Sequence, residues 1–101
     1  MTTTVQDNPD ASRFEITIDG ELAGFVDYRK DGNEYALPHT RVFTEFEGKG
    51  VGGQLIKGAL TEIAARGGTA LPYCPFVPRV IRDNPEFLEL VPEDQRATFG
   101  L

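Results

Sequence analysis

The densest chemical signal in the chain is a run of glycines at positions 48, 50, 52 and 53, with Lys49 and Val51 between them. Glycine lets backbone N–H groups approach phosphate oxygens closely, and a helix that starts just after such a loop adds a favourable dipole. An apolar periodic segment begins at Val51. Residues 48–53 therefore predict a phosphate-binding loop at the N-terminus of a helix.

Two common phosphate loops do not fit this run. A Walker-type loop requires a glycine where this chain has Phe43, and Ser or Thr where it has Gly50. The dinucleotide pattern G-x-G-x-x-G is met by Gly48, Gly50 and Gly53. That pattern also needs an acidic residue roughly 20 positions later, at the end of the next strand, and residues 67–73 contain no acid. The run is thus a phosphate loop of another kind.

His39 and Cys74 are the chain's one histidine and one cysteine. A single cysteine cannot form an intrachain disulfide, and the pair offers too few ligands for the usual zinc sites, so we expect no metal site. His39 is the natural candidate for a general base, although a strand histidine held by a neighbour is the commoner case. Cys74 precedes a proline that suits a first helical turn. Its thiol is a candidate nucleophile, a pocket-lining group or a small core side chain.

Three alternating segments predict the strands that position these groups. A strand beginning at Arg13 alternates apolar and polar residues and ends at a hairpin turn, Asp19-Gly20. Segments 21–29 and 34–43 continue the pattern, so we expect a three-stranded antiparallel meander. Pro38 lacks an N–H, and it therefore places the third strand at an edge, or bulges or splits it.

A long helix, a short strand and a second helix are predicted after the third strand. Apolar residues recur at three- and four-residue steps from Val51 to Ala64, and Gly67-Gly68 ends this helix. Residues 69–73 fit a buried strand parallel to the one before the glycine loop, and residues 75–82 fit a shorter helix. The predicted fold class is therefore α/β (α+β). It is a compact antiparallel meander leading to a parallel strand pair around a glycine loop, with one long and one short helix.

The chain length of 101 residues indicates one domain. Residues 1–12 are polar and show no period, so we predict a flexible N-terminal tail there. The domain is predicted at residues 13–91, and residues 92–101 are predicted as a C-terminal tail.

The order of strand, glycine loop and helix resembles the GCN5-related N-acetyltransferases (GNAT), whose pyrophosphate loop reads Gln/Arg-x-x-Gly-x-Gly/Ala. Residues 47–52 align with that motif, with Glu47 in place of the family's Gln or Arg. His39-Thr40 ahead of the loop, and Cys74 followed ten residues later by Asn84-Pro85, are similar to the small YjdJ-type branch of this superfamily. The resemblance covers residues 14–89. It implies a compact GNAT-like fold.

The resemblance also implies acetyl-CoA as co-substrate, without a metal, and acetyl transfer to a primary amine on a small molecule or a protein lysine. The loop amides would hold the pyrophosphate, a strand edge would hold the pantetheine, and Asn84 would contact the cofactor or cap a helix end. In direct transfer His39 would be the base, whereas in a covalent route Cys74 would carry the acetyl group. The cofactor-binding residues implied are Val42, Phe43, Lys49, Gly50, Val51, Gly52, Gly53 and Asn84.

A second hypothesis is a non-catalytic acyl-CoA-binding or sensing module. It is motivated by the lack of an unambiguous general base and by the shortness of the branch that the chain resembles. Acetyl transfer over a panel of amines separates the two hypotheses, because a pure binder shows affinity for CoA without acceptor-dependent thiol release.

The charge balance limits the expected partners. Ten basic against sixteen acidic residues give a formal net charge of −6, which disfavours nucleic acid. No apolar run approaches the ~20 residues of a membrane helix, and the N-terminus lacks a signal-peptide pattern, so we expect no membrane partner and a cytoplasmic location. An edge strand leaves a monomer or a weak homodimer as the expected state.

Overall fold

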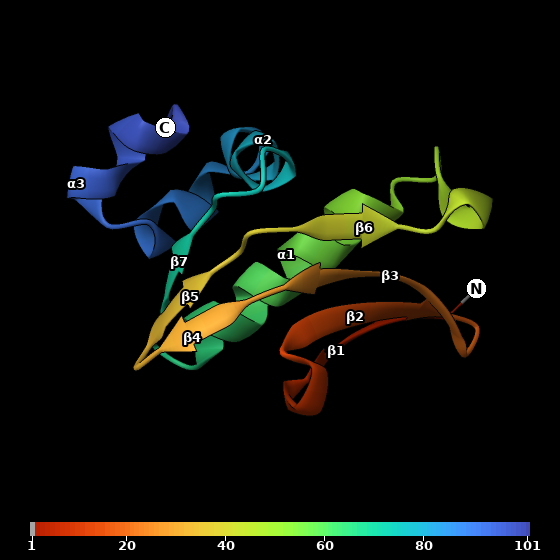
Figure 1. Ribbon diagram of the computed structural model, residues 1–101. Coiled ribbons are helices and arrows are strands. Elements are labelled where there is room, and N and C mark those ends of the chain that lie inside the picture. The colour runs from red at the N-terminus through yellow and green to blue at the C-terminus, as the bar shows by residue number, and fades with distance from the viewer. Residues whose placement is uncertain (1) are drawn as a thin grey trace.

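The computed structural model describes residues 2–101 and combines antiparallel strands, one parallel strand pair and helices packed on one side of them (Figure 1). The strands are β1 Thr3–Asn8, β2 Arg13–Ile18, β3 Glu21–Asp27, β4 Arg29–Asp31, β5 Glu34–Ala36, β6 Thr40–Val42 and β7 Thr69–Leu71. The α-helices are α1 Val51–Ala65, α2 Phe76–Asp83 and the single turn α3 Glu93–Arg96. Within residues 2–101, no helix is long and apolar enough to cross a membrane.

Two small sheets share one long hairpin. One sheet has the order β1-β2-β3-β6 with antiparallel neighbours, and the other has the order β4-β5-β7. Strand β3 passes into β4 through Tyr28, and β5 passes into β6 through residues 37–39, so both arms of the hairpin change sheet at the same level. Strand β7 pairs with β5 in parallel. The predicted mixed fold class is confirmed, and the predicted third strand 34–43 is split at Pro38 because proline cannot donate to a ladder.

Helix α1 begins and ends where the glycines predict. Gly50 is its N-cap residue at φ 72°, and Gly67 follows its last turn at φ 70°. The buried stripe of α1 consists of Val51, Leu55, Ile56, Ala59, Leu60 and Ile63, whereas Ala64, which the pattern includes, is exposed. A Cβ added to Gly58 would lie 2.7 Å from the Cβ of Val5, so this glycine allows α1 to approach β1 closely.

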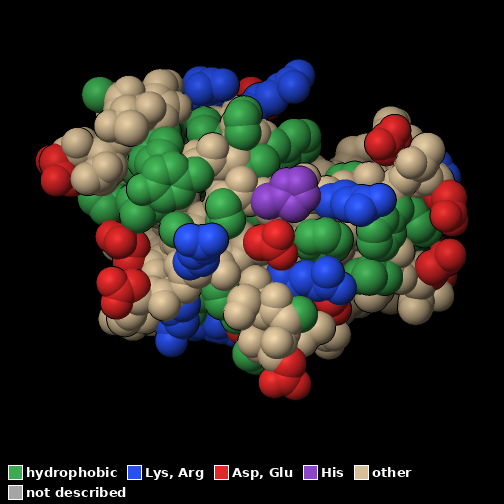
Figure 2. All heavy atoms as spheres, viewed as in Figure 1, with side chains coloured by type: hydrophobic (Ala, Val, Ile, Leu, Met, Phe, Trp, Pro, Cys, Tyr) green, Lys and Arg blue, Asp and Glu red, His purple; other side chains and the backbone are tan. Residues whose placement is uncertain are grey.

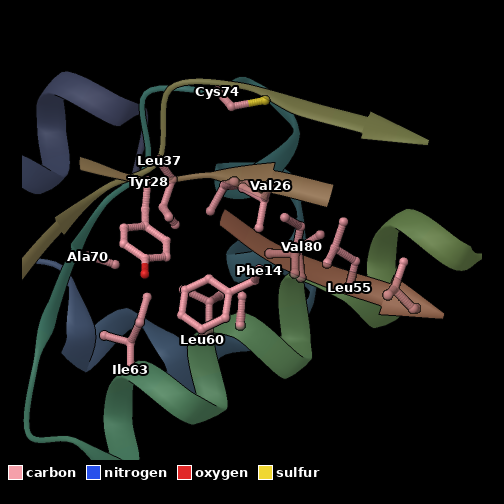
Figure 3. Close-up of a cluster of buried hydrophobic side chains, with 14 of the residues drawn as sticks. Phe14, Val26, Tyr28, Leu37, Leu55, Leu60, Ile63, Ala70, Cys74 and Val80 are labelled. Carbon is pink, nitrogen blue, oxygen red and sulfur yellow. The ribbon is translucent and has the colours of Figure 1, made fainter. Parts of the chain in front are cut away.

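The core lies between α1 and the inner faces of the strands (Figure 3). Phe14 and Val26 from the sheet meet Leu55 and Leu60 from the helix, and all four side chains are fully buried. Tyr28 joins this cluster where β3 passes into β4. Removing such side chains from water supplies the main stabilisation of the fold, at about 25 cal/mol per Å² of apolar surface.

The prediction of a flexible tail at residues 1–12 is wrong from Thr3 onward; Met1 lies outside the described residues. Thr3–Asn8 form β1 and pair along the whole of β2, with Val5 opposite Ile16. The sequence signal was weak because β1 contributes one apolar side chain, Val5, that packs on the core. Pairing with β2 satisfies a ladder of backbone groups that would otherwise form an open sheet edge.

The prediction of a tail at residues 92–101 is also wrong. Helix α3 and a 3-10 turn, Ala97–Phe99, fold this segment back onto the protein. Phe99 meets Tyr73 edge to face, with ring centroids 5.2 Å apart, and Leu101 packs partly buried against the core. Only Phe99 and Leu101 carry large apolar side chains among these ten residues, which gives no readable period, so the contacts that order this segment are tertiary.

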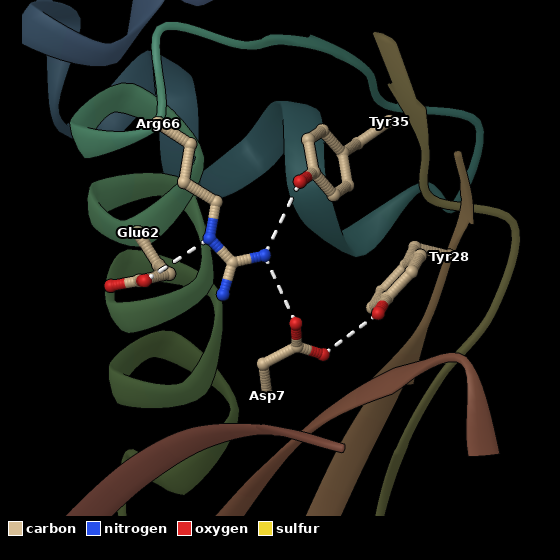
Figure 4. A network of polar contacts seen from close by, with 5 residues as sticks. All are labelled: Asp7, Tyr28, Tyr35, Glu62 and Arg66. Carbon is tan, nitrogen blue, oxygen red and sulfur yellow. Dashed lines mark hydrogen bonds and ion pairs between the residues drawn. The ribbon is translucent and has the colours of Figure 1, made fainter. Parts of the chain in front are cut away.

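A polar network ties β1 to the end of α1 (Figure 4). The guanidinium of Arg66 donates to Asp7 at 3.0 Å and to the hydroxyl of Tyr35 at 3.2 Å, and it pairs with Glu62 at 3.1 Å. The hydroxyl of Tyr28 donates to the other oxygen of Asp7 at 2.8 Å. The bonds to Tyr35 and Asp7 raise the pKa of Arg66, and burial together with the bond to Asp7 raises the pKa of Tyr28 to about 12.

The Tyr28 shift predicts a loss of stability in alkaline solution. The folded protein holds the phenol proton more tightly than the unfolded chain, so stability is fully present below about pH 10 and is lost as pH rises towards 12. We expect the free energy of unfolding to fall by up to about 3 kcal/mol across that window. In urea titrations at several pH values, the free energy of unfolding of Tyr28→Phe should fall less steeply with pH than that of the parent protein. The exposed control Tyr73→Phe should show the same fall as the parent. An unchanged slope in Tyr28→Phe would contradict the assignment.

Candidate functional site

The glycine loop presents its backbone outward at the start of α1. Gly48 and Gly50 both have positive φ, 78° and 72°, and an added Cβ at either would meet no protein atom within 4 Å. No side chain caps α1, so the first-turn amides have no side-chain acceptor among the described residues. Gly52 differs, because its Cβ would lie 2.7 Å from the ring of Phe76. Gly48 and Gly50 thus leave room for a ligand, and Gly52 leaves room for α2.

A hollow of about 510 Å³ joins this loop to the end of α2. It is lined by Gly50 and Gly53 on one side and by Asn84 on the other, with Lys57 contributing a positive charge. Gln54, Val80 and Asp83 complete the lining. The hollow therefore brings together three of the predicted cofactor-binding residues. Lys49 lines a different hollow, of about 250 Å³, beside Phe46 and the β2–β3 turn.

Asn84 closes the C-terminal end of α2. Its side-chain amide donates to the carbonyl of Val80 at 2.9 Å, and its own carbonyl accepts from the N–H of Phe87 at 3.1 Å. The capping role that the sequence allows is therefore present. Because the amide nitrogen faces Val80, the side-chain oxygen is the atom left for a ligand in the hollow.

The edge of β6 is open on one side. The carbonyl of His39 accepts from Asp27, and the N–H of Phe43 donates to Ala23, so these two residues turn their backbone groups towards β3. Backbone direction alternates along a strand, so Thr40 and Val42 turn theirs the other way. On the side that faces away from the β3–β4 arm, β5 pairs with β7, but β6 has no second strand partner within residues 2–101. Val42 is thus at an open edge, whereas Phe43 places its ring 6.2 Å from Phe25 on the outer face.

The hydroxyl of Thr40 is buried without a hydrogen-bond partner in the described chain. Replacing an unpaired buried hydroxyl by a methyl of similar shape removes its desolvation cost. We expect Thr40→Val to raise the free energy of unfolding by about 1 kcal/mol, measured by urea titration. The control is Thr61→Val, because the Thr61 hydroxyl is exposed and bonds to the Lys57 carbonyl at 2.7 Å. Destabilisation of the Thr40 variant would show that this hydroxyl has a partner.

Cys74 lies at the border of the core where the parallel pair ends (Figure 3). Its side chain is 8% exposed, and its N–H donates to the carbonyl of Leu37 at 2.8 Å. Its own carbonyl accepts from Val77 in the first turn of α2. Between the pairs Val26–Thr40 and Arg29–Ala36, residues 37–39 on one arm of the hairpin face residues 27–28 on the other, so the strand bulges at Leu37 and Pro38. The thiol is therefore held beside this bulge between β5 and β6, directly before α2.

His39 lies on the outer face of the sheet, at the centre of the surface in Figure 2. Its ring meets Phe25 edge to face, with centroids 6.3 Å apart, and no hydrogen bond to the imidazole occurs within residues 2–101. The bulge at Leu37 and Pro38 separates His39 from Cys74. The two candidate catalytic groups therefore flank one bulge without a direct contact between their side chains.

Asp27 has no signal of its own in the sequence. It is one of sixteen acidic residues, and only the structure shows that its N–H donates to the carbonyl of His39. Thr40 belongs to the pair that carries the family resemblance, but its burial is seen only in the structure. No group of His, Cys, Asp and Glu side chains in the described part of the chain could hold a metal ion.

Comparison with known proteins identifies the family. The profile of the family described as GCN5-related N-acetyl-transferase matches residues 13–90. The solution structure of a GCN5-like protein from Staphylococcus aureus superposes with a TM-score of 0.65 at 21% identity, over 88% of this chain and 87% of that one. A nourseothricin acetyltransferase matches with a TM-score of 0.47 at 34% identity, over 61% and 38% of the two chains. No curated protein matches the chain. The extent of the profile match, together with the open glycine loop at α1 and the shared fold, shows that this chain belongs to the GCN5-related N-acetyltransferase family.

Proposed function

We propose that the protein transfers the acetyl group of acetyl-CoA to a primary amine. The observation that carries the proposal is the open glycine loop at the start of α1, where a Cβ added to Gly52 would lie 3.4 Å from the side chain of Val42 on the open edge of β6. The path proposed for the donor runs from this loop along that edge to the bulge flanked by His39 and Cys74. Family membership supports acetyl transfer in general, and this path supports the donor. The reaction joins the amine nitrogen to the acetyl carbon and breaks the bond from that carbon to sulfur.

The residues of the path have separate parts in binding. Backbone amides at the start of α1 are suited to a pyrophosphate, because their N–H groups and the helix dipole both favour an anion. Lys57 adds a positive charge to the same hollow. The backbone groups of Val42 can hydrogen-bond an extended chain such as pantetheine, in the way that a free strand edge binds a peptide. Acetyl-CoA supplies a thioester, whose carbonyl is open to attack by a neutral amine.

His39 is suited to accept the proton that the attacking amine must lose. Its imidazole is exposed, so an acceptor can reach it, and no hydrogen bond within residues 2–101 occupies the ring nitrogens. The departing thiolate takes up one proton, so the sum of the reaction is one acetylated amine and one CoA thiol. A general base of this kind contributes about 100-fold or more to the rate.

Direct transfer predicts that Cys74→Ala remains active. We expect kcat within about tenfold of the parent protein, because the thiol packs at the core border and transfer needs no enzyme nucleophile. Intact-protein mass spectrometry after incubation with acetyl-CoA should show no acetyl adduct on Cys74 of the parent. An adduct that forms and decays as fast as turnover, together with loss of activity in Cys74→Ala, would establish the covalent route instead.

Steady-state acetyl transfer over a panel of primary amines tests the proposed function. Release of CoA thiol that depends on the amine, with the acetylated amine detected in equal amount, is the expected result. Saturable binding of CoA without transfer to any amine would replace the proposal by an acyl-CoA-binding or sensing module.

A further inference from the structure

A second hollow lies between the β1–β2 turn and the arm of the hairpin that carries β3 and β4, beside the bulge. It has a volume of about 570 Å³ and is lined by Asp27, Arg29, Lys30 and Pro38, together with Ala11, Ser12 and Tyr28. Its position is fixed by two backbone bonds: Tyr28 donates to the Ser12 carbonyl at 2.9 Å, and Asp27 donates to the His39 carbonyl at 2.8 Å. Hollows of this size accommodate small molecules.

The hollow carries charges of opposite sign that form no ion pair within residues 2–101. Asp27, Arg29 and Lys30 make no ion pair and no side-chain hydrogen bond with any residue of 2–101. The ammonium of Lys30 lies 5.9 Å from the ring centre of Tyr35. The carboxylate of Asp27 is partly buried, so a bound cation there would be less screened than on an open surface. Opposite unpaired charges lining one hollow fit a ligand that carries both signs.

The positions of the acidic and basic residues predict how a bound ligand is oriented. Asp27 is bonded to the backbone of His39, so the acidic end lies beside the bulge where acetyl transfer is proposed. Arg29 follows two residues later, at the start of β4, and a strand rises about 3.3 Å per residue. The guanidinium end is therefore about 7 Å from the acidic end, measured along the backbone. Side chains alternate along a strand, so Lys30 shares the face of its partner Tyr35 and adds positive charge at the rim of the hollow.

We propose that this hollow binds the amine acceptor, and that the acceptor is an ω-amino acid: a primary amine with a carboxylate four or five methylene groups away. The proposal rests on the proposed function, because it takes the acetyl group to be delivered at the bulge. Asp27 holds the ammonium end beside His39, which accepts the proton before attack. Arg29 binds the carboxylate, and the positive charge of Lys30 at the rim of the hollow favours it. The products are the N-acetylated amino acid and the CoA thiol, with the amine proton passed on to the thiolate.

Other amines fit the hollow less well. A polyamine would place its second ammonium against Arg29 and Lys30, where like charges repel. A simple alkylamine would leave both basic side chains without a partner. The α-ammonium and α-carboxylate of an amino acid are too close together to reach both ends of the hollow. Lysine spans the distance with its ε-ammonium, but its α-ammonium would lie beside Arg29 and Lys30, where like charges repel. The ω-amino acid satisfies both ends at once.

The test compares ε-aminocaproate with n-pentylamine, which has the same chain without the carboxylate. We expect kcat/KM to be about tenfold higher or more for ε-aminocaproate, because the carboxylate forms charge-assisted bonds. The double variant Arg29→Gln, Lys30→Gln should lose this preference, so that the ratio of kcat/KM for ε-aminocaproate to that for n-pentylamine falls to about 1. Asp27→Asn should lower activity towards both amines. Arg79→Gln, an exposed arginine on α2 that does not line this hollow, serves as the control for a lost positive charge and should keep the preference.

Binding of ε-aminocaproate to the CoA-loaded protein, followed by NMR chemical shifts, separates this proposal from the proposed function. If ε-aminocaproate binds to the parent protein but not to the double variant, and no amine is acetylated, the ligand site is supported and the proposed acetyltransferase activity is overturned. If both amines are acetylated with equal kcat/KM, unchanged in the double variant, the activity is supported and the ligand site is overturned. If ε-aminocaproate does not bind and no amine is acetylated, both proposals are overturned.

Discussion

Replacing Gly50 with glutamate is expected to weaken CoA binding by about 100-fold or more. Gly50 is the N-cap of α1, and its added side chain would point into space free of protein atoms, in the hollow beside Lys57. A glutamate there would offer its own carboxylate to the first-turn amides and repel the pyrophosphate. Calorimetric titration with CoA measures the loss.

Gly67→Glu is the matched control for this variant. Gly67 has a φ of 70°, close to the 72° of Gly50, and its Cβ would also meet no atom within 4 Å. Both variants therefore bear the same backbone strain and the same added charge, but Gly67 follows the other end of α1. We expect Gly67→Glu to bind CoA like the parent. Equal affinities of the two variants would remove the glycine loop from the binding site.

Replacing His39 is expected to lower kcat by about 100-fold while leaving the affinity for CoA unchanged. The imidazole lies on the outer face, and the residues that line the glycine-loop hollow do not include it. Its loss should therefore affect the chemical step alone. Single-turnover acetyl transfer, measured beside a CoA titration, separates the two quantities.

Two substitutions distinguish a proton acceptor from a packing residue at this position. His39→Phe keeps a ring against Phe25 but cannot titrate, and His39→Gln keeps a polar side chain but loses the ring. A proton acceptor predicts the same loss in both variants. Full activity in His39→Phe would show that the ring of His39 only packs on Phe25.

The sequence predicted those parts of the fold that have their own local signal. The helix from Val51 has both a periodic apolar stripe and a glycine at each end, so its bounds follow from the chain alone. Pro38 likewise predicted the break between β5 and β6. Strand β1 and the segment after residue 91 were missed because their order comes from distant contacts, such as Val5 on Gly58 and Tyr73 on Phe99.

In the candidate site, too, some residues could be predicted from the sequence and others depend on contacts between distant segments. Gly50, Gly53 and Asn84 meet in one hollow, although Asn84 is far from the loop in sequence, and the family resemblance rather than any spacing pointed to it. Phe43 was expected at the pantetheine edge, but strand alternation turns its N–H towards β3. The charges of Asp27 and Arg29 could not be singled out, because only the fold brings both into one hollow, with Asp27 paired to the backbone of His39.

The most direct test of the central claim is simultaneous measurement of CoA thiol release and acetylated amine in one reaction, with acetyl-CoA and ε-aminocaproate as substrates. The account predicts one acetylated amine for each thiol released, saturation with acetyl-CoA, and loss of both products in Gly50→Glu but not in Gly67→Glu. Thiol release that is independent of every amine tried, with no acetylated product, would contradict it.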